Sequence, residues 1–284
     1  MAMMRSAAFS RAMALREVDH GVYGARGPTF SGELNEHWTI GPKVHGGVML
    51  ALCANAARIA HGGGSGQPCM QPIAVSGNFL SAPDPGPMRL VTSIRKRGRR
   101  IGVVDVELNR GGRTALHAVV TMGEPEHQRL RPLVSANPAV GLMPPEPPPD
   151  VAPIGPGHPM AGLINLADGC DIRPMVSTLK RPKDGGPPVI QIWVRPRDAV
   201  PDVLFALMCG DVSAPVSFSV DRTGWAPTVQ LTAYLRGLPA DGWLRVICTT
   251  MQIGQDWFDE DHVVVDCQGR IVVQTRQLAM VPAQ

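Results

Sequence analysis

The longest apolar run of the chain follows a pair of glycines and predicts a buried helix. Residues 48–57 are Ala, Leu, Met, Val and Cys with a single Asn, and no charge appears before Arg58. A helix that is apolar on nearly every face belongs in a core. Gly46 and Gly47 before it carry no Cβ, so another group can approach the unpaired N–H groups of the first turn. Such a helix start suits an oxyanion or a polarised carbonyl.

Alternating apolar and polar positions predict strands around this helix, and a second set around a shorter helix-like run at 201–209. One or two short strands are expected within 18–38. The other expected strands are 72–80, 88–96, 101–109, 115–122, 189–195, 228–235, 243–251, 263–266 and 271–281.

The second half of the chain repeats the landmarks of the first at a nearly constant offset. Phe79-Leu80 and Tyr234-Leu235 precede similar turns, and Gly112-Arg113 matches Gly269-Arg270. The offset is about 155 residues in both cases, which indicates a duplicated α+β unit with one helix for each antiparallel sheet. We expect one repeat at 1–123, a Pro-rich linker at 124–160 and a second repeat at 161–284.

Composition narrows the class of protein. A formal charge of +3, two Tyr and six Phe give no basic, aromatic surface for nucleic acid. No apolar run is long enough to span a membrane, and residues 1–16 do not have the pattern of a signal peptide. The six cysteines form no C-x-x-C pair. We expect reduced thiols, a cytoplasmic location, and neither a metal nor a cofactor.

Several short motifs, in a shared order, resemble the acyl-CoA thioesterase II family. They are 45–47 before the Ala-rich helix, 79–83 and 97–99 in the first half, and 192–195, 202–204, 210–211, 243–244 and 268–270 in the second. The resemblance covers about 19–122 and 171–281. It implies a double hotdog, in which each of two tandem repeats wraps an antiparallel sheet around a helix. It also implies hydrolysis of acyl-CoA to a fatty acid and free CoA, within lipid metabolism.

The resemblance further implies a water-binding set of Asp, Thr or Ser, and Gln in the second repeat. Aligned on the motifs, these positions fall on Gln230, Thr250 and Gln277. Gln230 departs from the family, because an amide orients water but cannot take its proton. Strand alternation predicts that Gln230 shares a polar face with Thr228. An exposed sheet face with ordinary polar residues is the alternative explanation.

The first repeat supplies the other candidates. Backbone N–H groups of Gly46 or Gly47 would polarise the thioester carbonyl, or these glycines only allow close packing. His45 is a candidate for substrate binding, or a helix cap. Arg97 and Arg99, in the basic run 95–100, would meet the phosphates of coenzyme A, or lie in solvent at a hairpin tip.

Two functions remain open at this stage. The first is an acyl-CoA thioesterase that uses these residues on its acyl-CoA substrate. The second is a non-catalytic acyl-thioester-binding protein that has lost the catalytic Asp. Asp211, at the end of the second helix-like run, is the nearest alternative carboxylate, although the pattern favours a structural role for it at a helix end. We expect a homodimer, as double hotdog chains often associate.

Overall fold

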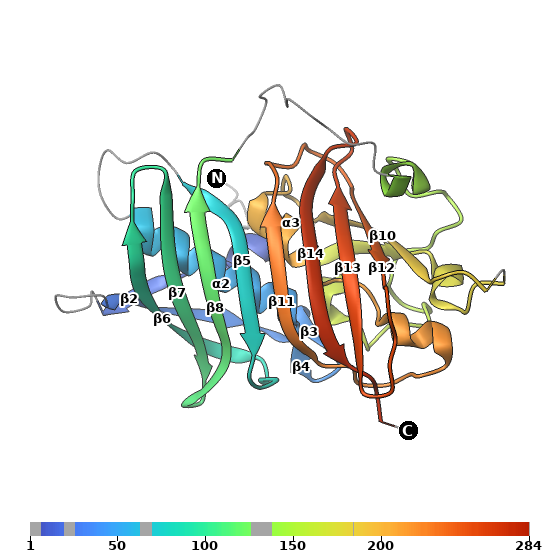
Figure 1. The fold of residues 1–284 in the computed structure, drawn as a ribbon, viewed down its shortest axis with the longest axis horizontal. Helices are drawn as coiled ribbons and strands as arrows, with labels where there is room; N and C mark the ends of the chain where they lie inside the picture. Colours follow the sequence, from blue (N-terminus) through green and yellow to red (C-terminus); the bar gives the residue numbers. More distant parts are fainter. Residues whose placement is uncertain (1–6, 20–25, 63–69, 126–137, 184, 284) are drawn as a thin grey trace, which may run out of the picture.

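Two helices lie inside one continuous, curved antiparallel sheet (Figure 1). The computed structural model describes residues 7–19, 26–62, 70–125, 138–183 and 185–283. In this part of the chain, twelve strands pair in the order β1-β2-β6-β7-β8-β5-β11-β14-β13-β12-β10-β9. This arrangement confirms the predicted α+β double hotdog.

The described residues of the first repeat form two α-helices and eight strands. They are α1 (Ala8–Ala12), β1 (Arg16–Asp19), β2 (Arg26–Leu34), β3 (Thr39–Ile40), β4 (Lys43–Val44), α2 (Gly46–Gly62), β5 (Gln71–Phe79), β6 (Gly86–Arg97), β7 (Ile101–Arg110) and β8 (Arg113–Gly123). β3 and β4 form a separate small hairpin just before α2. The four strands expected between 72 and 122 are therefore present, with no end shifted by more than two residues.

In the second repeat, the described residues form one short α-helix and six strands. They are β9 (Cys170–Pro174), β10 (Val189–Pro196), α3 (Val203–Cys209), β11 (Thr228–Leu235), β12 (Leu244–Thr249), β13 (Trp257–Val265) and β14 (Ile271–Met280). β13 begins six residues before the expected strand at 263–266, because the polar run 259–262 hid its alternation. β9 was not predicted.

α2 is buried on nearly all sides, as its apolar sequence predicts. Its first turn lies against α3, and strands β5 to β8 curve around its length. Leu50, Leu52 and Ala54 are fully buried. The helix ends at Gly62, and residues 63–69 lie outside the described part.

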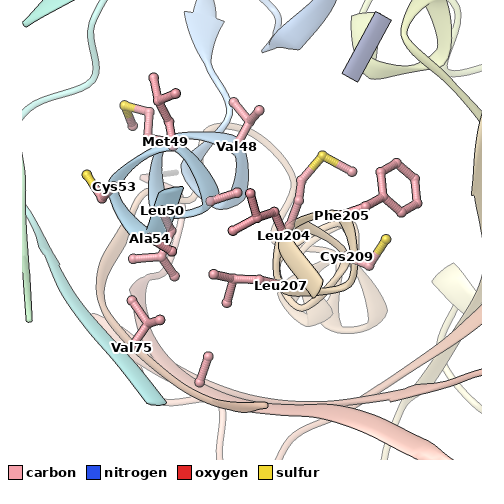
Figure 2. Packing of buried hydrophobic residues seen from close by; sticks show 14 of the residues in the cluster. Val48, Met49, Leu50, Cys53, Ala54, Val75, Leu204, Phe205, Leu207 and Cys209 are labelled. Atoms are coloured by element: carbon pink, nitrogen blue, oxygen red, sulfur yellow. The ribbon is translucent and has the colours of Figure 1, made fainter. Parts of the chain in front are cut away.

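α3 lies beside the first half of α2, and the two helices share one core (Figure 2). Leu204 and Leu207 face α2, while Val75 of β5 closes the core from the sheet side. The carboxylate of Asp202 accepts a hydrogen bond from the N–H of Phe205 at 2.8 Å and caps the helix. This cap fixes where α3 starts, and the residues after its end reach the N-terminus of α2.

The two halves of the sheet join through β5 and β11, which pair antiparallel along five positions from Gln230–Asn78 to Tyr234–Ala74. Ser76 and Thr232 add a side-chain hydrogen bond of 3.0 Å across this junction. The two repeats therefore share one sheet and one core.

The described part of the linker packs against the outer face of the second repeat. The residues that follow it, 163–164, contact Ile40 and Gly41 of the first repeat. Met143 and Val151 are buried in a second apolar cluster with Trp193 and Trp243. The indole N–H of Trp193 donates to the carbonyl of Pro144 at 3.0 Å. These buried contacts anchor this part of the linker to the second repeat. Residues 126–137 of the linker lie outside the described part.

Five of the six cysteines lie in the described residues, and all five are free thiols. Cys69 lies outside the described part. No helix among the described residues combines the length and the apolar character that crossing a membrane requires.

Candidate functional site

A cavity of about 730 Å³ opens where the two repeats and the linker meet. Its wall contains the N-terminus of α2, the segment after α3 and the ends of β11, β13 and β14. It also contains residues from 160–164, here called the linker end, where the linker passes into the second repeat. Its volume is within the range of sites that enclose a small organic ligand. The polar residues of this wall come from both repeats.

Asp211 places a carboxylate directly against the N-terminus of α2. It follows Gly210, where α3 ends, and it accepts a hydrogen bond from the N–H of Gly47. A Cβ on Gly46 would lie 2.7 Å from Oδ2 of Asp211, so only glycine allows this approach. Burial raises the pKa of Asp211, while His45 and the Gly47 N–H partly oppose that rise.

His45 orients the same carboxylate and caps α2. Its Nε2 lies 2.9 Å from the backbone oxygen of Asp211 and 3.7 Å from Oδ2. Its Nδ1 accepts the N–H of Val48 at 3.3 Å. An accepting Nδ1 places the proton on Nε2. The imidazole is therefore a buried connection between the two repeats.

A second polar group faces the cavity from three adjacent strands. The hydroxyl of Thr228 on β11 donates to Oε1 of Gln277 on β14 at 3.3 Å. The Nε2 of Gln277 donates to Oε2 of Glu260 on β13. Glu260 and Gln277 are direct partners in the β13–β14 ladder. The amide of Gln277 therefore has one orientation, with its oxygen toward Thr228.

Glu260 is a buried carboxyl with two hydrogen-bond donors. It is 2 % exposed, and the N–H of Val216 donates to its Oε1 at 2.7 Å. Burial raises its pKa to about 8, although both donors favour the ionised form. Asp211 lies near enough for its charge to raise this pKa further.

Three buried side chains beside the cavity have the chemistry of metal ligands. Donor atoms of Cys248, Glu260 and His262 lie within 4.8 Å of one another. Burial keeps the Cys248 thiol protonated by raising its pKa, and it lowers the pKa of His262 to about 3. His262 Nε2 is 2.8 Å from the Ser213 hydroxyl; its Nδ1 has no partner among the described residues. Glu260 is already bonded to Val216 and Gln277, and His262 to Ser213, so we assign no metal to these residues.

Gln230 does not lie with the other predicted residues. A bulge between Thr228 and Gln230 shifts the register of β11, so Thr228 faces the cavity while Gln230 faces the outer side of the sheet. Its amide donates to Ser76 at 3.1 Å and to Thr232 at 2.8 Å. The predicted common face of Gln230 and Thr228 is therefore wrong, because simple alternation does not include the extra residue of a bulge.

Thr250 is buried but does not line the cavity. It follows β12, and its hydroxyl donates to the carbonyl of Gln252 at 3.4 Å. Of the three residues aligned with the family, the structure places only Gln277 in the cavity wall, together with Gly46 and His45.

Arg97 and Arg99 lie at the other end of α2. The guanidinium of Arg97 donates to the carbonyl oxygens of His61 at 2.7 Å and Ala60 at 3.2 Å. A helix of 17 residues is about 25 Å long, which separates this contact from the cavity at Gly46. Arg99 is exposed in the turn after β6. The contact of both with coenzyme A stays a prediction.

Sequence reasoning missed Glu260, Ser213 and the cavity-facing role of Thr228. The available signal for Glu260 was the alternation in β13, where Phe258, Glu260 and His262 point inward between outward acids. Two ionisable residues on an inward face are unusual in a core and indicate a site.

Two family models match this chain in tandem. The acyl-CoA thioesterase N-terminal domain matches residues 34–123, and the C-terminal domain matches 144–281. The chain belongs to the acyl-CoA thioesterase family. The two matched segments correspond to the two halves of the sheet.

A relative and two solved structures are similar to this chain over nearly its whole length. An uncharacterized protein of Mycobacterium tuberculosis is 68% identical over 98% of this chain and the whole of that relative. A hot dog fold protein from Alicyclobacillus acidocaldarius superposes with a TM-score of 0.75 at 19% identity, covering 99% of this chain and 100% of the other. The acyl-CoA thioesterase II TesB2 from Mycobacterium marinum gives 0.68 at 16% identity, with 98% of each chain covered. At these identities the two structures support the fold alone.

Proposed function

We propose that this member of the thioesterase family hydrolyses acyl-CoA thioesters to a carboxylic acid and free CoA, with Asp211 as the general base. The observation that carries the proposal is the position of the Asp211 carboxylate. It lies against the N-terminus of α2 and in the same cavity wall as Thr228 and Gln277. A base, a donor for an oxyanion and groups that orient water are the parts that hydrolysis of a thioester needs.

Asp211 takes the proton from water as the water oxygen attacks the thioester carbon. A carboxylate with a raised pKa is a stronger base than a solvated one. When the tetrahedral intermediate collapses, the C–S bond breaks and the sulfur of CoA receives that proton. The carboxylate is then restored for the next cycle.

The start of α2 stabilises the negative charge that forms on the carbonyl oxygen. The Gly47 N–H is bonded to Asp211, so we assign the oxyanion to the N–H of Gly46 and to the positive end of the helix dipole. Because Gly46 has no Cβ, the thioester can reach this N–H beside the ring of Phe79.

Thr228 and Gln277 hold the attacking water. The Thr228 hydroxyl donates its hydrogen bond to Gln277, so its lone pairs remain free to accept a hydrogen bond from water. Glu260 fixes the Gln277 amide and so fixes the direction of the Thr228 hydroxyl. Gln230 and Thr250 have no part in this mechanism. The predicted homodimer and cytoplasmic location are unaffected by it.

The test is release of free thiol from acyl-CoAs of increasing chain length by the wild type and by Asp211→Asn. The amide keeps the size of the side chain but cannot accept the proton. We expect kcat to fall by about 10²–10⁴-fold. Asp105→Asn is the control, since Asp105 pairs with Arg95 at the surface of β7, away from the cavity. Thermal unfolding of both variants checks that they are folded.

Turnover by the wild type that Asp211→Asn removes and Asp105→Asn keeps would support the proposal. Turnover that survives in Asp211→Asn would exclude Asp211 as the base. A wild type without turnover that binds acyl-CoA would be the non-catalytic acyl-thioester-binding protein that the sequence left open.

A further inference from the structure

The end of the linker is part of the cavity and is not a passive connection. Met160, Leu163 and Ile164 all contribute to its wall. Ile164 is buried, while Leu163 leaves 48% of its surface exposed. Neither repeat provides these side chains from its sheet or its main helix.

Hydrogen bonds fix this segment to the hairpin that leads into α2. The N–H of Gly41 donates to the carbonyl of Leu163 at 2.7 Å, and Ile40 forms an antiparallel bridge with Ile164. Asn165 donates to the hydroxyl of Thr39 at 2.8 Å. Gly41 has φ of 54°, a backbone conformation that glycine adopts without strain. The position of Leu163 is therefore fixed relative to Gly46, which follows Gly41 by five residues.

Large apolar side chains remain uncovered around this cavity. Leu80, Leu163, Trp225 and Met280 line it and are 55%, 48%, 51% and 42% exposed. They come from the end of β5, the linker, the segment before β11 and the end of β14. Exposed apolar groups that converge on one cavity indicate a bound apolar group. The polar residues Asp211, Thr228 and Gln277 share this wall.

We infer that Met160 and Leu163 of the linker end form a wall of the acyl-chain site and set the length of chain that the cavity accepts. The inference rests on the proposed function, because it takes the ligand to be an acyl thioester. The reacting carbonyl lies at the polar residues, and the hydrocarbon chain then extends over the uncovered apolar side chains. An acyl chain is the part of the substrate that gains from such a surface, since each methylene buried there strengthens binding about fourfold.

A matched control exists in the same linker. Leu142 is also 48% exposed, but its side chain lies outside the cavity and its carbonyl accepts a hydrogen bond from Gln191. Leu163→Ala and Leu142→Ala therefore remove the same atoms from equally exposed positions. Only the first change enlarges the cavity.

The experiment measures binding of S-alkyl-CoA thioethers from hexyl to hexadecyl by calorimetry, and hydrolysis of the matching acyl-CoAs. For the wild type we expect affinity to rise with chain length and then to level off. Leu163→Ala removes three carbons, so the chain length at which affinity levels off should increase by about two carbons. Leu163→Trp should shorten it, and Met160→Ala should lengthen it. Leu142→Ala should leave it unchanged.

The inference is overturned if the Leu163 variants keep the wild-type chain-length profile, or if Leu142→Ala shifts it as much as Leu163→Ala does. Thermal unfolding identifies any variant that is not folded, and the opposite shifts expected of Ala and Trp distinguish cavity size from loss of stability. Hydrolysis with an unchanged Leu163 profile would support the proposed function and exclude the inference. Thioether binding with the expected shifts but without hydrolysis would support the inference and exclude the proposed function. No binding at any chain length would exclude both the function and the inference.

Discussion

The N–H of Gly47 in the first repeat donates a hydrogen bond to the carboxylate of Asp211 in the second. The two residues are far apart in sequence and meet because the end of α3 lies against the start of α2. This contact brings the only charged group of the α3 end to the positive end of the long helix. The candidate site thus exists only where the two repeats are joined.

Substitution of Gly47 tests how closely the helices approach. A Cβ there would lie 2.6 Å from the carbonyl oxygen of Met208 and 2.8 Å from the ring of His45. Gly47→Ala should lower the free energy of unfolding by about 1–3 kcal/mol and displace Asp211. Denaturant unfolding and thiol release measure the two effects.

Gly62, at the other end of α2, is the control for that change. A Cβ on Gly62 meets nothing within 4 Å. Gly62→Ala should be neutral or stabilise by up to about 1 kcal/mol, because alanine favours the helix. Equal losses of stability in both variants would contradict the packing argument.

Single substitutions test which polar residues hold the attacking water. The structure places Thr228 and Gln277 in the cavity wall, whereas the alignment of family motifs also names Gln230. Thr228→Val and Gln277→Ala should each lower kcat by about 10²-fold, since water is no longer held in place. Gln230→Ala should leave kcat near the wild-type value, as its amide bonds to Ser76 and Thr232 on the outer face. Steady-state thiol release with each variant gives the answer, and a large loss in Gln230→Ala alone would favour the motif alignment.

The buried Glu260 makes stability depend on pH. Its folded pKa of about 8 lies above the ordinary value of 4.5, so the folded state holds a proton that the unfolded state has lost. The stabilisation by this proton is present below about pH 4.5 and is lost as the pH rises to about 8. Glu260→Gln cannot titrate, so its stability relative to the wild type should increase over this window, by up to roughly 5 kcal/mol.

The measurement is the free energy of unfolding of both proteins from pH 5 to 9. His262, with its pKa lowered to about 3, has the opposite sign and loses its contribution as the pH falls through the range below 6.5. Because both proteins contain His262, the difference between them isolates Glu260. A difference independent of pH would show that Glu260 is ionised in the folded state like an ordinary carboxyl.

Substitution of Arg97 and Arg99 tests whether these side chains stabilise the fold or contact coenzyme A. Arg97 bonds to the last carbonyls of α2, so Arg97→Ala should lower stability by about 1 kcal/mol and leave the KM for acyl-CoA unchanged. Arg99→Ala should change neither quantity, because Arg99 is exposed in a turn. Thermal unfolding and KM are measured on the same preparations. A several-fold higher KM in either variant would instead support binding of the CoA phosphates.

The sequence by itself determined the elements and their duplication. The apolar run at 48–57 predicts a buried helix. The alternating runs in both halves predict strands that each bury one face. Together they predict a helix wrapped by a sheet in each repeat. It also indicated the bare start of α2. These features depend on local periodicity and on glycine, which a single sequence records directly. Gln277 was named only through the resemblance to the thioesterase family.

Only the tertiary structure decided which polar groups meet. The bulge before Gln230 turned that residue outward and Thr228 inward, and one inserted residue is enough to do this because side chains alternate along a strand. Asp211 and Glu260 reached the cavity through the contact of α3 with α2 and the pairing of β13 with β14. Contacts between distant segments depend on how the repeats pack and on register, and periodicity along the chain contains neither.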